Sequence, residues 1–172
     1  DEYVLCAGNI CKRKNQLELA RASRIAKIPL RLIGSVLPGE EAYADLIREE
    51  CDLDGGEYLS WTLGVPPKSS ELIELYQGAK VFALLSHHET QPISILEAAS
   101  TGNSLLLARQ VLFDGAFFVS PKSMASMVTG LQQVFYADQG EYCLSGSSLL
   151  RCTASAVGTE YARLYETCLE RF

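Results

Sequence analysis

Several signals that would assign a function directly are missing from this chain of 172 residues. No stretch approaches the roughly 20 apolar residues that a transmembrane helix requires, and we find no secretory signal peptide. The dinucleotide fingerprint G-x-G-x-x-G is absent after the first apolar run, which argues against a dehydrogenase. Internal repeats and low-complexity segments are also missing. The composition, with 48% hydrophobic and 21% charged residues, is typical of a soluble globular protein.

Positive charge is scarce. The chain has 15 Lys and Arg against 21 Asp and Glu, for a net charge of -6. This balance argues against non-specific binding to nucleic acid, so we expect no nucleic-acid partner. One compact basic run, Lys12-Arg13-Lys14, stands out in this acidic background. It is either a local anion site or an ordinary solvated surface.

Metal-binding patterns are missing too. The six cysteines, at positions 6, 11, 51, 143, 152 and 168, form no CxxC or other zinc spacing. His87 and His88 are neighbours on a loop with no third ligand in view, so we expect no metal. We read the cysteines as reduced thiols of a cytoplasmic protein, with peripheral attachment at the inner face of a membrane as a further option.

Short apolar runs alternate with helical patterns along the whole chain. Strands are expected near 3–7, 30–33, 57–61, 81–85, 104–107 and 116–119. Helices are expected from an N-cap at Asn15 through Ile25, around Tyr43 to Ile47, from Ser69-Ser70 to Gly78, over about 94–101, after Pro121 and over about 155–170, with an irregular connection at 137–152. This alternation predicts one α/β domain over 1–172, with a doubly wound, mostly parallel Rossmann-like sheet of about six strands.

Two acids occupy a strand-to-helix turn. Glu89 follows the run 81–85, and Glu97 lies in the next helix, with seven residues between them. Such turns bind ligands in open sheets, and the first N–H groups of a helix attract anions. A diphosphate near Gln91 to Ile95 would place Glu97 near the hydroxyls of a ribose. Glu89 would then reach a sugar attached beyond the phosphates.

The same acids have a simpler interpretation. Ser94-x-x-Glu97 has the spacing of a capping box, and an acid in the first helical turn is favourable in any case. Glu89 can equally be an exposed loop residue. Spacing alone does not separate these interpretations.

A resemblance separates them. It is carried by the motifs Gly8-Asn9-Ile10-x-x-Arg13-Lys14-Asn15, Leu63-Gly64-Val65, the segment 72–86, Glu89 to Glu97-Ala98-Ala99, Gly102 and Tyr161-x-x-x-Tyr165-Glu166. With these motifs, the chain resembles the retaining GT-B glycosyltransferases over roughly 3–135 and 155–170. That family includes many lipopolysaccharide and phosphatidylinositol mannosyltransferases. The resemblance implies one half of a GT-B fold, the nucleotide-sugar domain, with an N-terminal acceptor domain outside this chain.

The resemblance also implies roles for single residues. Lys14, with Arg13, would hold the donor diphosphate, Glu97 would bind the ribose, and Glu89 would face the donor sugar. Glu89 and Lys14 are therefore the expected catalytic pair. The other expected donor-binding residues are Gly8, Asn9, Leu63, Thr90, Gln91, Ile93 and Ser94.

Three departures from the family pattern affect the same site. Asn9 stands where the family often has an arginine, although Arg13 fits a variant with the arginine just before the lysine. Thr90 and Pro92 replace the usual glycines, and Pro92 removes one N–H donor. The stretch 108–116 is short and lacks the usual acidic, glycine-rich loop.

The implied activity is transfer of a sugar from a nucleoside diphosphate sugar, with retention, to an acceptor such as a glycan or lipid-linked saccharide. No metal or further cofactor is expected. The acceptor and the base would come from the N-terminal domain, so this chain alone should bind donor weakly and transfer nothing. The alternative is a nucleotide-binding module or pseudo-enzyme. An epimerase of similar fold is less favoured, because we find no base-and-nucleophile set.

Overall fold

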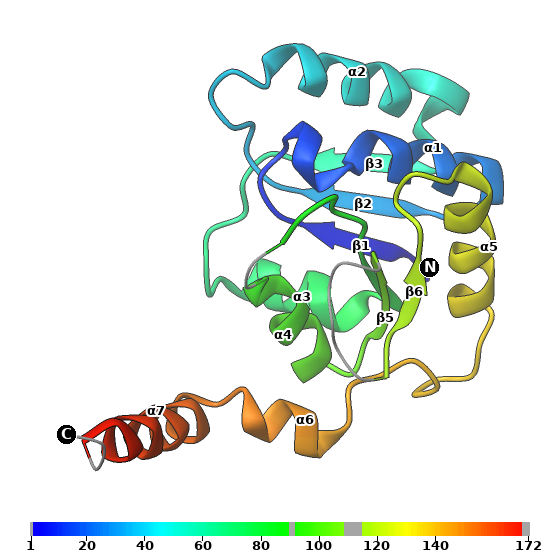
Figure 1. Cartoon of the computed structure of the whole chain (residues 1–172). Coiled ribbons are helices and arrows are strands. Elements are labelled where there is room, and N and C mark those ends of the chain that lie inside the picture. The colour runs from blue at the N-terminus through cyan, green and yellow to red at the C-terminus, as the bar shows by residue number, and fades with distance from the viewer. Residues whose placement is uncertain (1, 90–91, 109–114, 170–172) are drawn as a thin grey trace.

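The computed structural model describes residues 2–89, 92–108 and 115–169, and its centre is a parallel sheet with strand order β3-β2-β1-β4-β5-β6 (Figure 1). Every neighbouring pair runs parallel. The strands are β1 (Val4–Ala7), β2 (Leu30–Ile33), β3 (Leu59–Thr62), β4 (Val81–Leu84), β5 (Ser104–Ala108) and β6 (Phe117–Val119). The prediction of a doubly wound sheet of about six strands is confirmed, and the sheet is entirely parallel.

Helices cover both faces of this sheet (Figure 1). The helices of the described ranges are η1 (Lys12–Lys14), α1 (Gln16–Ala26), α2 (Glu41–Asp52), η2 (Leu53–Gly56), α3 (Ser70–Gly78), α4 (Ile93–Ser100), α5 (Met124–Phe135), α6 (Gly146–Arg151) and α7 (Ala154–Leu169). Successive residues of a strand point to opposite faces. In β1, Val4 and Cys6 pack in the core with α1, α2 and α5, whereas Leu5 and Ala7 pack in the core with α3 and α4.

Burial explains which strands were easiest to predict. All residues of β1, β4 and β5 are buried, as expected for strands covered on both faces, which read as continuous apolar runs. The edge strand β3 has only Leu59 fully buried. It is observed two residues later than the expected start at 57, because its weaker apolar pattern marks the boundary poorly.

Two details of the expected helices are wrong. Residues 137–152 are not entirely irregular, because α6 begins there with Ser145 accepting a hydrogen bond from the backbone N–H of Ser148 at 3.2 Å. The segment is rich in Gly and Ser, which are more typical of loops, so this short helix was not predicted. Ile25 was expected in the buried stripe of α1 but is 56% exposed, because Ala22, Ser23 and Ala26 fill the buried positions of the last turns.

The topology of the sheet predicts where a ligand would bind. The chain leaves β1 towards α1 on one face and leaves the adjacent β4 towards α4 on the other face (Figure 1). In open α/β sheets, ligands bind outside the carboxyl ends of strands at such a switch point. The connections that follow β1 and β4 carry Lys14 and Glu89, so the fold brings these distant segments to one edge of the sheet.

The remaining features concern the chain as a whole. In Figure 1, α7 lies away from the sheet, beyond α6. Within the described ranges, no helix has the length and apolar character needed to cross a membrane. Five of the cysteines, at positions 6, 11, 51, 143 and 152, are free thiols. The same ranges contain no group of three His, Cys, Asp or Glu that could hold a metal ion.

Candidate functional site

A cleft of about 510 Å³ opens at the carboxyl edge of the sheet. Its floor comes from the residues that follow β1 and β2, and its walls come from the loop after β3, from α3 and from the start of α4. The lining residues are Ala7, Gly8, Asn9, Lys14, Ile33, Gly34, Ser35, Gly64, Val65, Pro67, Leu72, Tyr76, Glu89, Pro92, Ile93, Ser94 and Glu97.

Most of the expected site residues meet in this cleft. They are Gly8, Asn9, Lys14, Glu89, Ile93, Ser94 and Glu97. Thr90, Gln91 and most of the stretch 108–116 lie outside the described residues. Leu63 is not among the lining residues and is 63% exposed, because the loop after β3 reaches the cleft through the next two residues, Gly64 and Val65.

Glu89 is the electrostatic centre of the cleft. Its Oε1 lies 2.8 Å from Lys14 Nζ and 3.2 Å from Arg13 Nη1, and it accepts a hydrogen bond from Ser86 Oγ at 2.7 Å. The Glu89 side chain is only 7% exposed, so the interpretation as an exposed loop residue is wrong. Burial alone would raise the pKa of Glu89. The hydrogen bonds from Lys14 and Ser86 and the charges of Lys14 and Arg13 outweigh burial and lower the pKa below its ordinary value.

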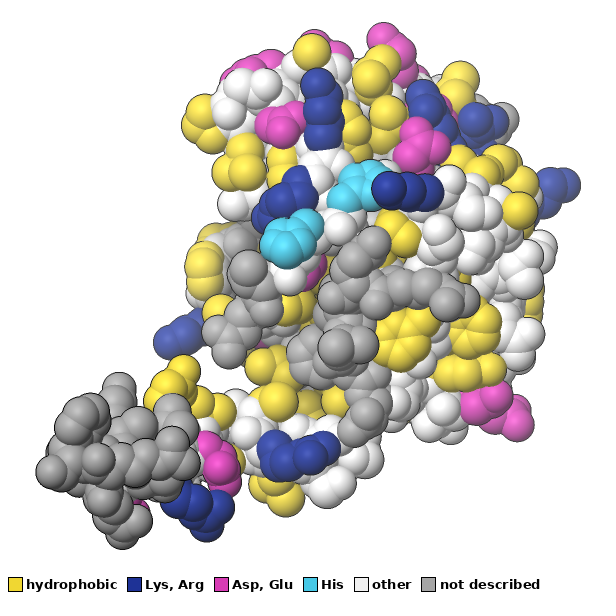
Figure 2. Space-filling model, in the orientation of Figure 1, with side chains coloured by type: hydrophobic (Ala, Val, Ile, Leu, Met, Phe, Trp, Pro, Cys, Tyr) yellow, Lys and Arg dark blue, Asp and Glu magenta, His cyan; other side chains and the backbone are white. Residues whose placement is uncertain are grey.

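Backbone contacts join the two connections that carry these charges. The N–H of His87 donates to the carbonyl of Arg13 at 2.9 Å, and Arg13 Nη1 donates to the carbonyl of His88 at 2.6 Å. Arg13 therefore contacts Glu89 without lining the cleft itself. Both histidines are exposed and lie among Lys and Arg side chains on the surface (Figure 2). The basic run is thus partly a solvated surface and partly a set of partners for Glu89.

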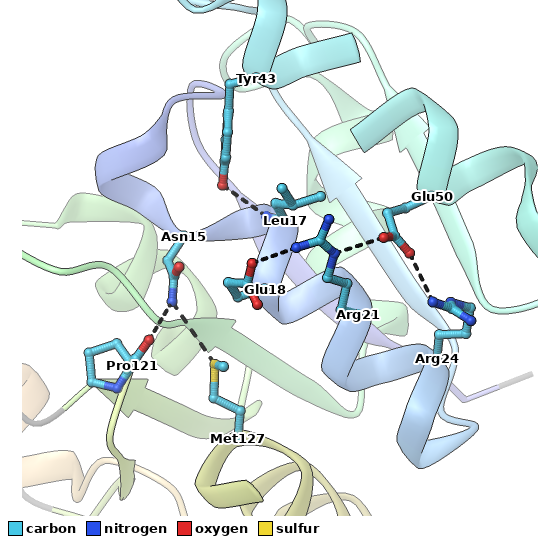
Figure 3. A network of polar contacts seen from close by, with 9 residues as sticks. All are labelled: Asn15, Leu17, Glu18, Arg21, Arg24, Tyr43, Glu50, Pro121 and Met127. Carbon is cyan, nitrogen blue, oxygen red and sulfur yellow. Dashed lines mark hydrogen bonds and ion pairs between the residues drawn. The ribbon is translucent and has the colours of Figure 1, made fainter. Parts of the chain in front are cut away.

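Hydrogen bonds to neighbouring elements anchor the segment that carries Lys14 (Figure 3). Asn15 sits at the N-cap of α1 in the left-handed conformation, but its side chain makes no capping hydrogen bond. Its amide donates instead to the carbonyl of Pro121 at 3.0 Å, which ties it to the loop between β6 and α5. The N–H of Leu17 donates to the hydroxyl of Tyr43 at 2.9 Å, which ties α1 to α2. These contacts fix where Lys14 enters the cleft.

A charged cluster continues this anchoring along α1 (Figure 3). The almost buried Glu50 of α2 accepts a hydrogen bond from Arg21 Nε at 2.8 Å and lies 3.3 Å from Arg24. Arg21 also pairs with Glu18 at 2.8 Å. Helix α1 is therefore held on its outer side by ion pairs, while its inner side packs on the sheet.

Glu97 is placed by α4 and by a tyrosine of α3. The capping box is not formed: Pro92 is the N-cap of α4, and both Ser94 and Glu97 lie within the helix. Instead, Glu97 Oε2 accepts a hydrogen bond from the Tyr76 hydroxyl at 2.8 Å. From the sequence, Tyr76 lies within the helix expected from Ser69-Ser70 to Gly78, and it received no role of its own. The available signal was an aromatic residue with a polar tip at a core position, which needs a partner when buried.

Bare backbone forms the floor of the cleft. Gly8 has φ of +149°, and a Cβ there would lie 3.5 Å from Lys14 Nζ. Gly34, at φ +155°, packs so closely that its Cβ would lie 2.0 Å from the carbonyl oxygen of Gly8. The ends of β1 and β2 can therefore approach each other, and leave room above them, only because both residues lack side chains.

The cleft combines groups suited to two kinds of ligand chemistry. Lys14 and the amino end of α4 offer positive charge, and an N-cap proline leaves the first N–H groups of α4 without a side-chain acceptor. Glu97 and Glu89 offer carboxylates that accept hydrogen bonds from hydroxyls. Phosphate groups joined to polyhydroxylated rings would engage both.

Comparison with known proteins gives this geometry a context. Residues 1–111 match the family model described as Glycosyl transferases group 1. None of the curated proteins matches the chain.

Solved structures share the fold. Anabaena HepE, in complex with UDP and glucose, has a TM-score of 0.72 and 17% identity, covering 98% of this chain and 48% of that one. A UDP-forming α,α-trehalose-phosphate synthase from Burkholderia vietnamiensis has a TM-score of 0.80 and 12% identity, covering 97% and 45%. The C-terminal domain of LpcC, a glycosyl transferase group 1 family protein from Francisella tularensis, has a TM-score of 0.67 and 17% identity, covering 92% and 86%.

These likenesses establish the architecture. The sheet is the Rossmann-like domain found in GT-B glycosyltransferases, as the resemblance implied. The chain spans about half the length of HepE and of the trehalose-phosphate synthase. It spans most of the isolated LpcC domain.

Proposed function

Because the chain belongs to the glycosyl transferases group 1 family, we propose that it is the donor-binding domain of a retaining glycosyltransferase. The sugar would pass from a nucleoside diphosphate sugar to an acceptor such as a glycan or a lipid-linked saccharide. One observation carries the proposal: Gly8, Lys14, Glu89 and Glu97 line a single cleft at the switch point of the sheet.

Each part of the donor has a suitable partner in the cleft. The ribose hydroxyls donate to Glu97, as a carboxylate in a dinucleotide site accepts from a ribose. The diphosphate lies between the amino end of α4 and Lys14, where both offer positive charge. The base lies against the apolar wall formed by Ile33, Val65 and Leu72. In HepE the bound molecules are UDP and glucose, which fits a donor of this class.

The cleft residues supply electrostatic stabilisation during transfer. As the bond to the anomeric carbon breaks, negative charge grows on the leaving diphosphate, and the Lys14 ammonium stabilises it. Glu89 is ionised at neutral pH, and its neighbours lower its pKa further. Its carboxylate stabilises the positive charge that develops on the sugar ring. Preorganised charges of this kind are often the largest single contribution to catalysis. The acceptor and its base belong to a separate domain, so this chain binds donor without transferring sugar.

Titration of UDP-, GDP- and ADP-sugars by calorimetry tests the proposal. We expect one nucleotide class to bind the wild-type chain, and Glu97→Ala and Lys14→Ala each to weaken that binding by about tenfold or more. Glu74→Ala and Lys122→Ala are matched controls, because both residues are exposed and lie outside the cleft lining. Unchanged affinity in these controls assigns the loss to the cleft.

The alternative has a distinct result. A nucleotide-binding module or pseudo-enzyme with a degraded donor site would bind none of the three donors, and Pro92 at the start of α4 is the departure that favours it. Sugar transfer by this chain alone, at the rate of a full-length relative, would contradict the proposed division of labour between the two domains.

A further inference from the structure

We propose that Tyr76 is the positioning residue for Glu97, and that it thereby sets the preference of the cleft for ribonucleotides over 2′-deoxyribonucleotides. The inference rests on the proposed function, because it assumes that Glu97 receives the ribose. It gives a residue of α3 a role in placing a carboxylate that α4 carries.

The contact itself is direct. The Tyr76 hydroxyl donates to Glu97 Oε2 at 2.8 Å, and both residues line the cleft. A carboxylate has about four acceptor positions, so one bond from Tyr76 leaves capacity for both hydroxyls of a ribose. The donor from α3 therefore orients the carboxylate and does not compete with the ligand for it.

Tyr76 is rigid enough to act as a reference point. It is only 4% exposed, and its ring packs against Phe82 with centroids 5.8 Å apart. Its carbonyl accepts a hydrogen bond from the Asn103 amide at 2.9 Å. The carbonyl of the preceding Leu75 accepts one from the Tyr3 hydroxyl at 2.7 Å. Burial, followed by the contact with Glu97, raises the pKa of Tyr76, so its hydroxyl keeps the proton that it donates.

Glu97 needs such a partner. Although it lines the cleft, Glu97 is an exposed residue on a short helix. A glutamate free in solvent loses rotamer entropy when a ligand orders it. A carboxylate already held by Tyr76 has met this cost before binding, and preorganisation of this kind raises affinity. The gain applies only to ligands that use the carboxylate, namely those with an intact ribose diol.

Calorimetric titration with paired nucleotides tests the inference. UDP and 2′-deoxy-UDP, GDP and 2′-deoxy-GDP, and ADP and 2′-deoxy-ADP are each titrated into wild type, Y76F, E97Q and the double variant. We expect wild type to prefer the ribonucleotide, Y76F to reduce that preference about three- to tenfold, and E97Q to remove it. The double variant should equal E97Q, because the hydroxyl acts through the carboxylate.

A matched control separates positioning from stability. Y43F also removes a buried hydroxyl that is hydrogen-bonded, here to the Leu17 N–H, but it lies outside the cleft (Figure 3). Y43F should lower the melting temperature and leave the ribose preference unchanged. Phenylalanine at position 76 keeps the ring that packs on Phe82, so Y76F should retain the fold, as circular dichroism would verify.

Three outcomes would overturn the inference. They are a Y76F variant that keeps the wild-type preference, a Y76F variant that weakens ribo- and deoxyribonucleotides equally, and a double variant in which the effects of Y76F and E97Q add. If any of these is found while E97Q still removes the preference, the role of Tyr76 is refuted and the proposed donor site stands. If the wild-type chain shows no ribose preference and E97Q does not change its nucleotide affinity, both the proposed donor site and the role of Tyr76 are refuted.

Discussion

Lys14 Nζ lies 2.8 Å from Glu89 Oε1, and both side chains are largely shielded from solvent. The sequence comparison implied that these residues serve different parts of the donor, the lysine its phosphates and the glutamate its sugar. In the structure they are partners of each other. A phosphate that reaches Lys14 must therefore compete with an internal carboxylate.

This competition predicts opposite effects of two substitutions on nucleotide affinity. Glu89→Gln should strengthen the binding of a nucleoside diphosphate about three- to tenfold, because it frees the lysine, whereas Lys14→Met should weaken it about tenfold or more. Nucleoside diphosphate sugars should gain less from Glu89→Gln, since the sugar loses a contact. Calorimetry with both ligand types measures this. Equal weakening by the two variants would show that Glu89 does not compete for the cation.

The same pair predicts a pH dependence of stability. The pKa of Glu89 is lowered in the folded state, so its stabilising contribution is complete above the unfolded value of about 4.3 and is lost as pH falls through the folded pKa. Glu89→Gln should therefore lower the free energy of unfolding by about 1–2 kcal/mol at pH 7. The difference from wild type should shrink as pH falls below the unfolded value and through the folded pKa. Urea unfolding at several pH values measures it, and a difference that stays constant would contradict the prediction.

The two glycines of the cleft floor predict two different failures. Gly34→Ala places a Cβ 2.0 Å from the Gly8 carbonyl oxygen, so it should destabilise the fold by about 3 kcal/mol or more. Gly8→Ala meets only Lys14 at 3.5 Å, so it should cost about 1–2 kcal/mol and mainly reduce nucleotide affinity. Gly39→Ala, with φ of +86° and nothing within 4 Å, controls for backbone strain. Chemical denaturation and calorimetry together separate the effects, and equal stability of the Gly34 and Gly39 variants would refute the clash.

Two residues in the left-handed conformation predict opposite effects of glycine on stability. Lys27, at φ 56°, is exposed and ends α1, so Lys27→Gly should relieve strain and raise stability by about 0.5–1 kcal/mol. Asn15, at φ 60°, is buried and donates to Pro121, so Asn15→Gly should lower stability by about 1–2 kcal/mol despite the same relief. Thermal melting of both variants is the measurement. A stabilised Asn15 variant would show that the bond to Pro121 contributes little.

Prediction from sequence succeeded where a physical signal is local. Strands buried on both faces read as apolar runs, so β1, β4 and β5 could be recognised directly. Ser69 was recognised as the cap of α3 because a serine before an apolar stripe has one common use, and its side chain does accept from the N–H of Leu72. Local signals failed at Asn15 and at Ser94, where a capping residue type or spacing serves another purpose.

The order of residues was thus enough to establish the alternating α/β architecture, the family and the two acids of the strand-to-helix turn, because hydrophobic periodicity and motif spacing are properties of neighbouring positions. Folding was needed to pair Lys14 with Glu89 and Tyr76 with Glu97. Those partners lie on separate elements, so their distances depend on how the parallel strands place successive loops at one edge of the sheet.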